Sequence, residues 1–311
     1  MKAIVIEQYG GIEELKELEL ERPVINDDQV LLEIHATSIN PIDWKLREGY
    51  LKEMLPFEFP IILGWDAAGV IAERGKNVTK FEVGDRVFTR PLTTRQGTYA
   101  EYVPVEEYLL AKMPETMSFE EGAAIPLTGL TAWEGLVEIA GVKEGDKVLV
   151  HAGAGGVGTF AIQIAKSFGA FVATTASEKN AELLESLGAD QVIDYKNEDF
   201  SEVLSDFDIV LDTMGGEIRT KSFGILKSKG KLVSIIEPPS EGEEKKYDVE
   251  IGYLFLEPDG AKLQKLADLY ESGKLKAVIG ETFDFTEKGL KNAHKLSETH
   301  HAQGKLVVRI K

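Results

Sequence analysis

The chain has 311 residues, of which 43% are hydrophobic, and it carries a formal net charge of −18 at pH 7. This length is sufficient for two domains with separate cores, and the acidity argues against nucleic acid and anionic membranes as partners, because both require a basic surface. The chain contains no cysteine, which excludes disulfides, thiolate metal sites and a catalytic Cys.

The first ten residues, MKAIVIEQYG, indicate a short strand rather than a signal peptide. No apolar run approaches the length of a membrane span. We therefore expect a soluble cytoplasmic protein.

Residues 1–122 form a β-rich pattern. Short apolar or alternating runs at 3–6, 30–36, 67–73, 86–88 and 99–104 are separated by turn signals. Such spacing is typical of a barrel-like sheet. Ser118 followed by Glu120 and Glu121 then predicts the start of a helix.

Strands and helices alternate in the next part of the chain. Strands are expected at 147–151, 171–175, 191–194, 207–212 and 231–236, and helices at 156–168, 179–187 and 217–226. This order predicts a parallel sheet with helices on both faces.

The last third returns to the first pattern. Residues 237–247 hold two prolines and many charges, which predicts an exposed loop, and 249–256 is strand-like. An amphipathic helix at 258–272, a strand at 279–285, a helix at 288–299 and a strand at 305–310 follow. The similarity to the N-terminal pattern indicates a domain split by the insertion of the alternating strand–helix region.

The stretch 147–170 places a glycine turn between a strand and a helix. Gly153, Gly155 and Gly158 match the dinucleotide fingerprint G-x-G-x-x-G. Glycine allows the main chain to approach a diphosphate, and the start of the helix offers free N–H groups and a positive dipole end. The alternative is a turn that only packs a helix on a sheet.

Eight motifs occur in a characteristic order. They are NPID at 40–43, GWDAAG at 64–69, VGDRV at 83–87, GTYAEY at 97–102, TGLTA at 128–132, AGAGGVG at 152–158, DTMGG at 212–216 and GK at 304–305. Over nearly the whole chain they resemble the medium-chain dehydrogenase/reductases, above all the zinc-free quinone oxidoreductase branch.

The resemblance implies an α/β fold of two domains. A GroES-like catalytic domain would comprise residues 1–122 and 257–311, and a Rossmann domain residues 123–256, with the active site in the cleft between them. It also implies a homodimer, which we place at the strand 249–256.

The positions that hold zinc in metal-dependent relatives carry other residues here. Asn40 stands where those relatives have a Cys, and Trp65-Asp66 where they have His-Glu. The cysteine-rich lobe is replaced by RPLTTRQ at 90–96. Apart from the adjacent pair His300-His301, and adjacent residues rarely chelate together, no histidine has a ligand partner at metal-binding spacing. We expect no zinc, and a hydrogen-bonded core role for His151. A zinc alcohol dehydrogenase is the less favoured alternative.

The strand ending near residue 175 decides between NADPH and NADH. NAD sites carry an acid there for the ribose hydroxyls, whereas this chain has Ser177 and Lys179, which suit a 2′-phosphate. Glu178 is a contrary sign. Ser177 could also cap a solvated helix start, which is compatible with phosphate binding. We expect NADPH rather than NADH.

The resemblance assigns the remaining cofactor contacts. Tyr195 is expected at the adenosine phosphate, and Asn40 and Thr128 at the nicotinamide. The other expected contacts are Gly153, Gly155, Gly156, Val157, Gly158, Thr213, Gly215, Ile235, Ile236, Gly304 and Lys305. For Ile235 and Ile236 the alternative is a plain core role.

The expected reaction is hydride transfer to a quinone or to the β-carbon of an enone or enal, because no metal would activate an alcohol. Tyr50 is the candidate proton donor beside Asn40 and Thr128, although relatives place their tyrosine at the position of Leu51. Tyr50 could instead shape the rim of the pocket. The competing hypothesis is a catalytically weak nucleotide-binding or sensing protein of the same fold.

Overall fold

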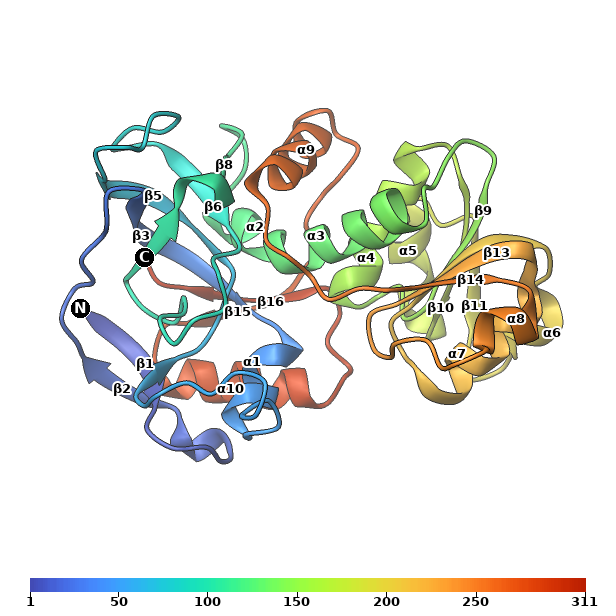
Figure 1. Ribbon diagram of the computed structural model, residues 1–311, viewed down its shortest axis with the longest axis horizontal. Coiled ribbons are helices and arrows are strands. Elements are labelled where there is room, and N and C mark those ends of the chain that lie inside the picture. Colours follow the sequence, from blue (N-terminus) through green and yellow to red (C-terminus); the bar gives the residue numbers. More distant parts are fainter. The chain divides into compact units, whose positions relative to one another are not determined.

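The computed structural model describes residues 1–311 and divides the chain into two compact units (Figure 1). The first unit comprises Met1–Leu127, Pro258–Glu271 and Ala277–Lys311, and the second comprises Thr128–Glu257 and Ser272–Lys276.

These bounds differ from the expected ones in two short segments and at Glu257, which belongs to the second unit. Residues 123–127 belong to the first unit, because helix α2 (Phe119–Ala124) packs against strands of its sheet. Residues 272–276 belong to the second unit, where the Gln163 side chain donates to the Lys276 carbonyl at 3.0 Å and accepts from the Lys276 N–H at 2.8 Å.

The first unit is built on a seven-stranded sheet with the order β15-β16-β3-β5-β6-β8, and β7 also pairs with β3. Its strands are β3 (Gln29–Ile39), β5 (Ala67–Arg74), β6 (Arg86–Thr89), β7 (Tyr102–Glu106), β8 (Leu110–Lys112), β15 (Ile279–Asp284) and β16 (Lys305–Arg309). A smaller sheet joins β2 (Lys16–Glu19), β1 (Lys2–Ile6) and β4 (Ile61–Ile62). Strand β3 contacts β5, β7 and β16, so the C-terminal strand completes a sheet begun near the N-terminus.

Three further helices cover this unit: α1 (Pro41–Arg47), α9 (Gly260–Glu271) and α10 (Glu287–Glu298). Helix α10 packs against α1, β15 and β16, and α9 packs against β8. Buried Trp65 and Tyr99 belong to the core between the small sheet, α1 and α10. Asn40, the N-cap of α1, therefore lies next to a core to which the small sheet, α1 and α10 all contribute.

The second unit contains a six-stranded parallel sheet with the order β11-β10-β9-β12-β13-β14. Its strands are β9 (Lys147–Val150), β10 (Phe171–Ala176), β11 (Gln191–Asp194), β12 (Phe207–Asp212), β13 (Leu226–Ser234) and β14 (Glu250–Tyr253). Numbered along the chain this is the order 3-2-1-4-5-6 of dinucleotide-binding sheets.

Helices cover both faces of this sheet. They are α3 (Pro126–Trp133), which starts in the first unit, α4 (Gly156–Ser167), α5 (Ala181–Ser186), α6 (Phe200–Val203), α7 (Gly216–Ser222) and α8 (Glu243–Tyr247). Figure 1 shows α4 and α5 on one side of the sheet and α7 and α8 on the other. Both faces of the parallel sheet are therefore buried, as such sheets require.

The segment 237–247, expected to be a loop, ends in helix α8. Two contacts with α7 and the turn after it explain the difference. Arg219 donates to both carboxylate oxygens of Glu243 at 2.7 Å, and the rings of Phe223 and Tyr247 stack with centroids 4.3 Å apart. Tertiary packing therefore overrides the polar, proline-containing composition.

The glycine turn between β9 and α4 is a close contact of main chains. A Cβ on Gly158 would lie 2.5 Å from the Ala152 carbonyl oxygen and 2.6 Å from Gly153 Cα, and one on Gly153 would lie 2.0 Å from Thr174 Oγ1. A Cβ on Gly155 would meet only the Ala152 oxygen, at 3.3 Å. Gly153 and Gly158 are thus required by the turn itself, whereas Gly155 leaves a free surface.

His151 follows β9 and lies in the core of the second unit. Its Nδ1 is 3.2 Å from Thr175 Oγ1, and its Nε2 is 2.8 Å from Ser222 Oγ. Burial lowers the pKa of His151 to about 4, because the charged ring would lose its hydration. The expected packed, hydrogen-bonded role of His151 is confirmed.

We predict that Gly158→Ala lowers the free energy of unfolding by about 2–3 kcal/mol, because the new methyl group overlaps the main chain. In an unhindered helix the same change would stabilise by roughly 0.5–1 kcal/mol. Gly155→Ala serves as the matched control and should stay within about 0.5 kcal/mol of wild type. Urea-induced unfolding measures both, and equal stabilities for the two variants would contradict this view of the turn.

A second prediction concerns pH. The unfolded chain takes up a proton on His151 near pH 6.5, but the folded chain does so only near pH 4. The unfolded state therefore holds more protons in this window, and the wild type loses about 3 kcal/mol of stability from this group as pH falls through it. His151→Gln removes the titration, so its unfolding free energy should fall less steeply between pH 6.5 and pH 4. Identical slopes for wild type and variant would refute the assignment.

Candidate functional site

The first part of the site is the exposed side of the turn between β9 and α4. Helix α4 is twelve residues long, its N-cap Gly155 has extended backbone, and no side chain caps it. Its first turn contains no acidic residue, and residues 154–157 are half-buried. The first N–H groups and the positive end of the helix dipole therefore face an accessible surface, which favours an anion such as a diphosphate. Gly156 and Val157 lie at this point.

Further expected residues follow the carboxyl ends of β12 and β13. Thr213 Oγ1 donates to the His151 carbonyl at 2.9 Å, and the Gly215 N–H donates to Asp212 Oδ1 at 2.8 Å. The Ile235 N–H donates to the Asp212 carbonyl at 3.1 Å. The structure thus brings Thr213, Gly215 and Ile235 to the same edge of the sheet as the glycine turn, where open α/β sheets bind ligands.

Ile235 and Ile236 are not core residues. Ile235 is half-buried, and Ile236 is 44% exposed. The alternative of a plain core role is therefore wrong.

Asp212 is a residue of this edge that sequence reasoning missed. Its carboxylate accepts from the N–H groups of Met214 and Gly215, at 3.0 and 2.8 Å, and from Ser234 Oγ at 2.7 Å. These bonds shape the turn after β12. An Asp that ends a buried strand three residues before a Gly-Gly pair was the available signal.

Ser177, Lys179 and Tyr195 lie beyond the end of β10. Ser177 is 8% exposed and is the N-cap residue of the short helix Glu178–Asn180, but its side chain makes no capping bond to that helix, and its Oγ accepts from Asn180 Nδ2 at 3.2 Å. Its hydroxyl proton remains available as a donor. Lys179 is exposed, and Tyr195 is 55% exposed and joined to the strand end by a 3.2 Å bond from its N–H to the Ala176 carbonyl.

The second part of the site lies in the first unit, where Asn40, Asp66 and Lys305 meet. The three side chains are buried. Asn40 Nδ2 donates to Asp66 Oδ2 at 2.7 Å, and the Lys305 ammonium donates to Asn40 Oδ1 and, at 3.3 Å, to Asp66 Oδ2. Burial lowers the pKa of Lys305, and the nearby Asp66 opposes that shift. A buried anion and a buried cation thus compensate each other around one amide.

A hydrogen-bonded chain continues from Asn40 to the other end of α1. Asp43 Oδ2 accepts from the Asn40 N–H at 2.8 Å and from the Tyr99 hydroxyl at 2.7 Å. The Tyr99 hydroxyl is also 3.1 Å from His294 Nε2, and His294 Nδ1 is 3.1 Å from an Arg47 nitrogen. Asp43 therefore closes the N-terminus of α1 and fixes the main chain at Asn40.

Burial controls the titration of this chain of residues. It raises the pKa of Asp43 to about 7, against the bonds from Asn40 and Tyr99. It lowers the pKa of His294 to about 3, with the Arg47 charge adding to the effect. His294 is consequently neutral at physiological pH, and its ring can accept from one neighbour.

The remaining expected residues lie as follows. Tyr50 is 71% exposed, with its ring edge-on to Trp44 at 6.4 Å. Thr128 lies in α3 of the second unit and is 4% exposed. Gly304 has φ +61°, and a Cβ there would lie 2.2 Å from the Val278 carbonyl oxygen, so Gly304 allows the turn that starts β16.

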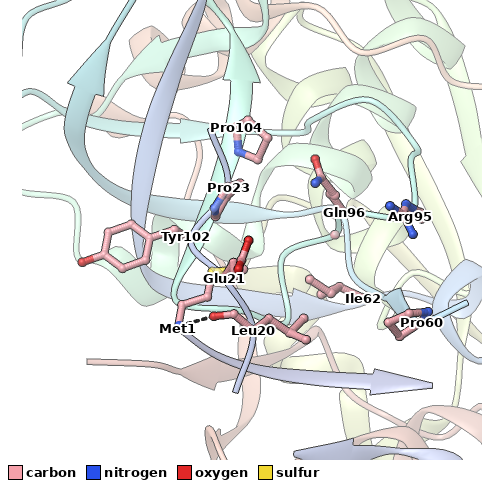
Figure 2. Close-up of a pocket in the computed structure, with 11 residues that line it drawn as sticks. Met1, Leu20, Glu21, Pro23, Pro60, Ile62, Arg95, Gln96, Tyr102 and Pro104 are labelled. Atoms are coloured by element: carbon pink, nitrogen blue, oxygen red, sulfur yellow. Dashed lines mark hydrogen bonds between the residues drawn. The ribbon is translucent and has the colours of Figure 1, made fainter. Parts of the chain in front are cut away.

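A pocket of about 140 Å³ lies elsewhere in the first unit, lined by Met1, Leu20, Arg95, Gln96 and Tyr102 among others (Figure 2). None of the expected site residues lines it.

The donor set does not fit a metal ion. No group of three or more His, Cys, Asp or Glu side chains is placed to hold one. The Asp66 carboxylate, where metal-dependent relatives carry a ligand, already accepts from Ser38 Oγ, Asn40 Nδ2, the Lys305 ammonium and the Leu127 N–H. Separately, the helices are all too short or too polar to cross a lipid bilayer.

Comparison with known families places both units. Residues 26–115 match the alcohol dehydrogenase GroES-like domain, and residues 187–308 match a family described as zinc-binding dehydrogenase. Residues 130–217 match the C-terminal domain of alanine dehydrogenase/PNT.

Individual relatives cover the whole chain. A 2-methylene-furan-3-one reductase from Solanum lycopersicum is 39% identical over 99% of this chain and 79% of its own length. The chloroplastic NADPH-dependent alkenal/one oxidoreductase of Arabidopsis thaliana is 37% identical over the same shares. The solved structure of a quinone oxidoreductase from Coxiella burnetii is 36% identical with a TM-score of 0.93, covering 100% of this chain and 99% of its own.

The GroES-like and Rossmann folds, the ordered motifs and these full-length similarities lead to one assignment. The chain is an oxidoreductase of the medium-chain dehydrogenase/reductase superfamily and belongs to its quinone oxidoreductase-like members.

Proposed function

We propose that the protein is an NADPH-dependent reductase that delivers hydride, without a metal, to a quinone or to the β-carbon of an α,β-unsaturated carbonyl compound. The observation that carries the proposal is the uncapped start of α4 behind a turn that glycine alone can form. The names of the relatives, which include a 2-methylene-furan-3-one reductase, an alkenal/one oxidoreductase and a quinone oxidoreductase, support the same class of acceptor.

The second unit would hold the cofactor. Main-chain N–H groups at Gly156 and Val157 would bind the diphosphate, while Gly153 and Gly158 keep the turn in shape. Thr213, Gly215, Ile235 and Ile236 are proposed contacts along the same edge. When bound, the nicotinamide supplies the hydride.

The end of β10 supports NADPH over NADH. A 2′-phosphate carries negative charge that the exposed Lys179 can neutralise and that the free Ser177 hydroxyl can bind. Tyr195 is exposed beside the strand end and can cover the adenosine side. The nearest acid, Glu178, is exposed and follows the strand rather than ending it.

The buried cluster in the first unit supports a reaction without a metal. Asp66 is saturated by donors that include an ammonium group, so a metal would have to displace Lys305. Without a Lewis acid, the suitable acceptors are those whose product anion is intrinsically stabilised, namely quinones and conjugated carbonyls. One hydride and one proton then reduce the acceptor.

Tyr50, Asn40 and Thr128 are the residues proposed to meet the reactants. The exposed Tyr50 hydroxyl can pass a proton from solvent to the reduced acceptor. We also propose a homodimer through β14, the edge strand of the six-stranded sheet, which is followed by Phe255 at 61% exposure. Sedimentation velocity would show a monomer if this is wrong.

The assay that tests the function follows NADPH and NADH oxidation with a quinone, an enal, an enone and an aliphatic ketone as acceptors. We expect turnover with the first three, a preference for NADPH, and full activity after dialysis against a chelator. NADPH binding without turnover across the panel would favour a nucleotide-binding or sensing protein. Loss of activity on chelation, restored by zinc, would favour an alcohol dehydrogenase of the zinc type.

Lys179→Met tests the choice of nucleotide. Removing the charge should weaken NADPH binding by about tenfold, as expected for one charge-assisted hydrogen bond, and should leave NADH binding unchanged. Lys80→Met, which removes an exposed lysine of the first unit, is the matched control. Fluorescence titration measures the affinities, and equal losses for NADPH and NADH would place the 2′-phosphate elsewhere.

A further inference from the structure

Lys305 has used all its donors inside the first unit. Its side chain is 3% exposed, and Nζ donates to the Ile39 carbonyl at 3.1 Å, to Asn40 Oδ1 and to Asp66 Oδ2 at 3.3 Å. A lysine ammonium has three N–H donors. Lys305 therefore has none left for a cofactor or substrate, and its expected role as a cofactor contact must be indirect.

Asp66 is the matching anion. Its Oδ2 accepts from Ser38 Oγ and Asn40 Nδ2, each at 2.7 Å, and its Oδ1 accepts from the Leu127 N–H at 2.7 Å. A buried carboxylate is stable only when it is paired and hydrogen-bonded. Lys305 and these donors meet that requirement. Lys305 and Asp66 therefore form a fixed pair of opposite charges, which we call the frame.

The Asn40 amide lies within this frame in one orientation. Its oxygen faces the Lys305 ammonium, and its nitrogen faces the Asp66 carboxylate. A flipped amide would set N–H groups against the ammonium and the oxygen against the carboxylate. Nδ2 carries two N–H donors, of which one is bound to Asp66, and the structure gives the second no acceptor within the chain.

We propose that Lys305 and Asp66 are positioning residues that fix the Asn40 amide so that its second N–H donates to a carbonyl oxygen of a bound reactant. The oxygen belongs either to the nicotinamide carboxamide or to the acceptor, and the experiment below distinguishes the two. The proposal rests on the proposed function for the identity of the reactants, but the frame itself is a property of the first unit alone.

The ammonium does more than orient the amide. A cation bound to the amide oxygen draws electron density from the nitrogen, and hydrogen bonds in such a chain strengthen one another. The remaining N–H becomes a better donor to an oxygen that gains negative charge during hydride transfer, and a prepositioned donor of this kind favours the transition state.

The test uses the double variant Lys305→Met/Asp66→Asn, which removes both charges together. Lys305→Met alone would leave a buried, uncompensated carboxylate and would be expected to unfold. The matched control is Lys16→Met/Glu7→Gln, which removes an exposed pair with a 3.5 Å separation in the same unit. Thermal unfolding checks that both variants are folded.

The first readout needs no cofactor. The chain has six asparagines, and Asn40→Ala, which removes the amide without burying a further charge, identifies the side-chain amide resonance of Asn40 in ¹⁵N-labelled protein. We expect this resonance to shift in the double variant and to stay in place in the control. An unshifted resonance in the double variant would overturn the proposal.

The second readout identifies the oxygen. If it belongs to the nicotinamide, the double variant binds NADPH about tenfold more weakly but binds 2′-phospho-ADP-ribose, which lacks the nicotinamide, as wild type does. If it belongs to the acceptor, NADPH affinity is unchanged, kcat falls by about 10–100-fold, and the isotope effect with NADPH deuterated at the transferred position rises.

Two results of the second readout would overturn the proposal. Equal weakening of NADPH and 2′-phospho-ADP-ribose would mean that the pair acts on the whole binding surface rather than on Asn40. Unchanged affinity together with unchanged kcat would mean that the amide serves no reactant. A wild type that oxidises NADPH with none of the acceptors would defeat the proposed function instead, and it would leave the resonance shift intact.

Discussion

The close approach of main chains at the start of α4 is the constraint on which the second unit depends. Gly158 brings the first turn of the helix to within contact of the Ala152 carbonyl, and Gly153 brings the turn against Thr174 on β10. No side chain can enter this space, so the helix N-terminus is left open to an anion. The same packing buries the His151 side chain, beside the turn, away from water, so its imidazole stays neutral.

The first unit depends on a different constraint, which is the burial of opposite charges in its interior. Asp66 and Lys305 compensate each other and leave Asn40 in a single orientation. Asp43 and Tyr99 hold the main chain of the same residue from the other side. Asn40 is therefore fixed by two independent sets of contacts, which is the kind of support that a group acting on a reactant requires.

Much of the fold could be predicted from local sequence. The alternation of β-branched runs with helical periodicity indicated the parallel sheet, and the glycine spacing indicated the turn at Gly153–Gly158, because both signals arise within a few residues. Helix α8 could not be predicted in this way. It forms because Arg219 pairs with Glu243 and Tyr247 stacks on Phe223. These contacts join residues more than twenty positions apart, so no local sequence pattern predicts them.

Only part of the site could be predicted, because contacts between distant segments leave no local pattern in the sequence. Motifs named Asn40 and Lys305, but their meeting with Asp66 joins three segments that are far apart in sequence, and only the structure shows that Lys305 has no donor to spare. Asp212 stands in the motif DTMGG, but its role was missed because the hydrogen bonds by which it shapes the turn are visible only in the structure.

The central claim is that bare main chain at the start of α4 holds the diphosphate of NADPH. A crystal structure of the protein with bound NADPH tests it most directly. The account predicts that the diphosphate oxygens lie within hydrogen-bond distance of the Gly156 and Val157 N–H groups, with the 2′-phosphate at Ser177 and Lys179. A diphosphate bound elsewhere, with the turn from Gly153 to Gly158 left empty, would contradict it.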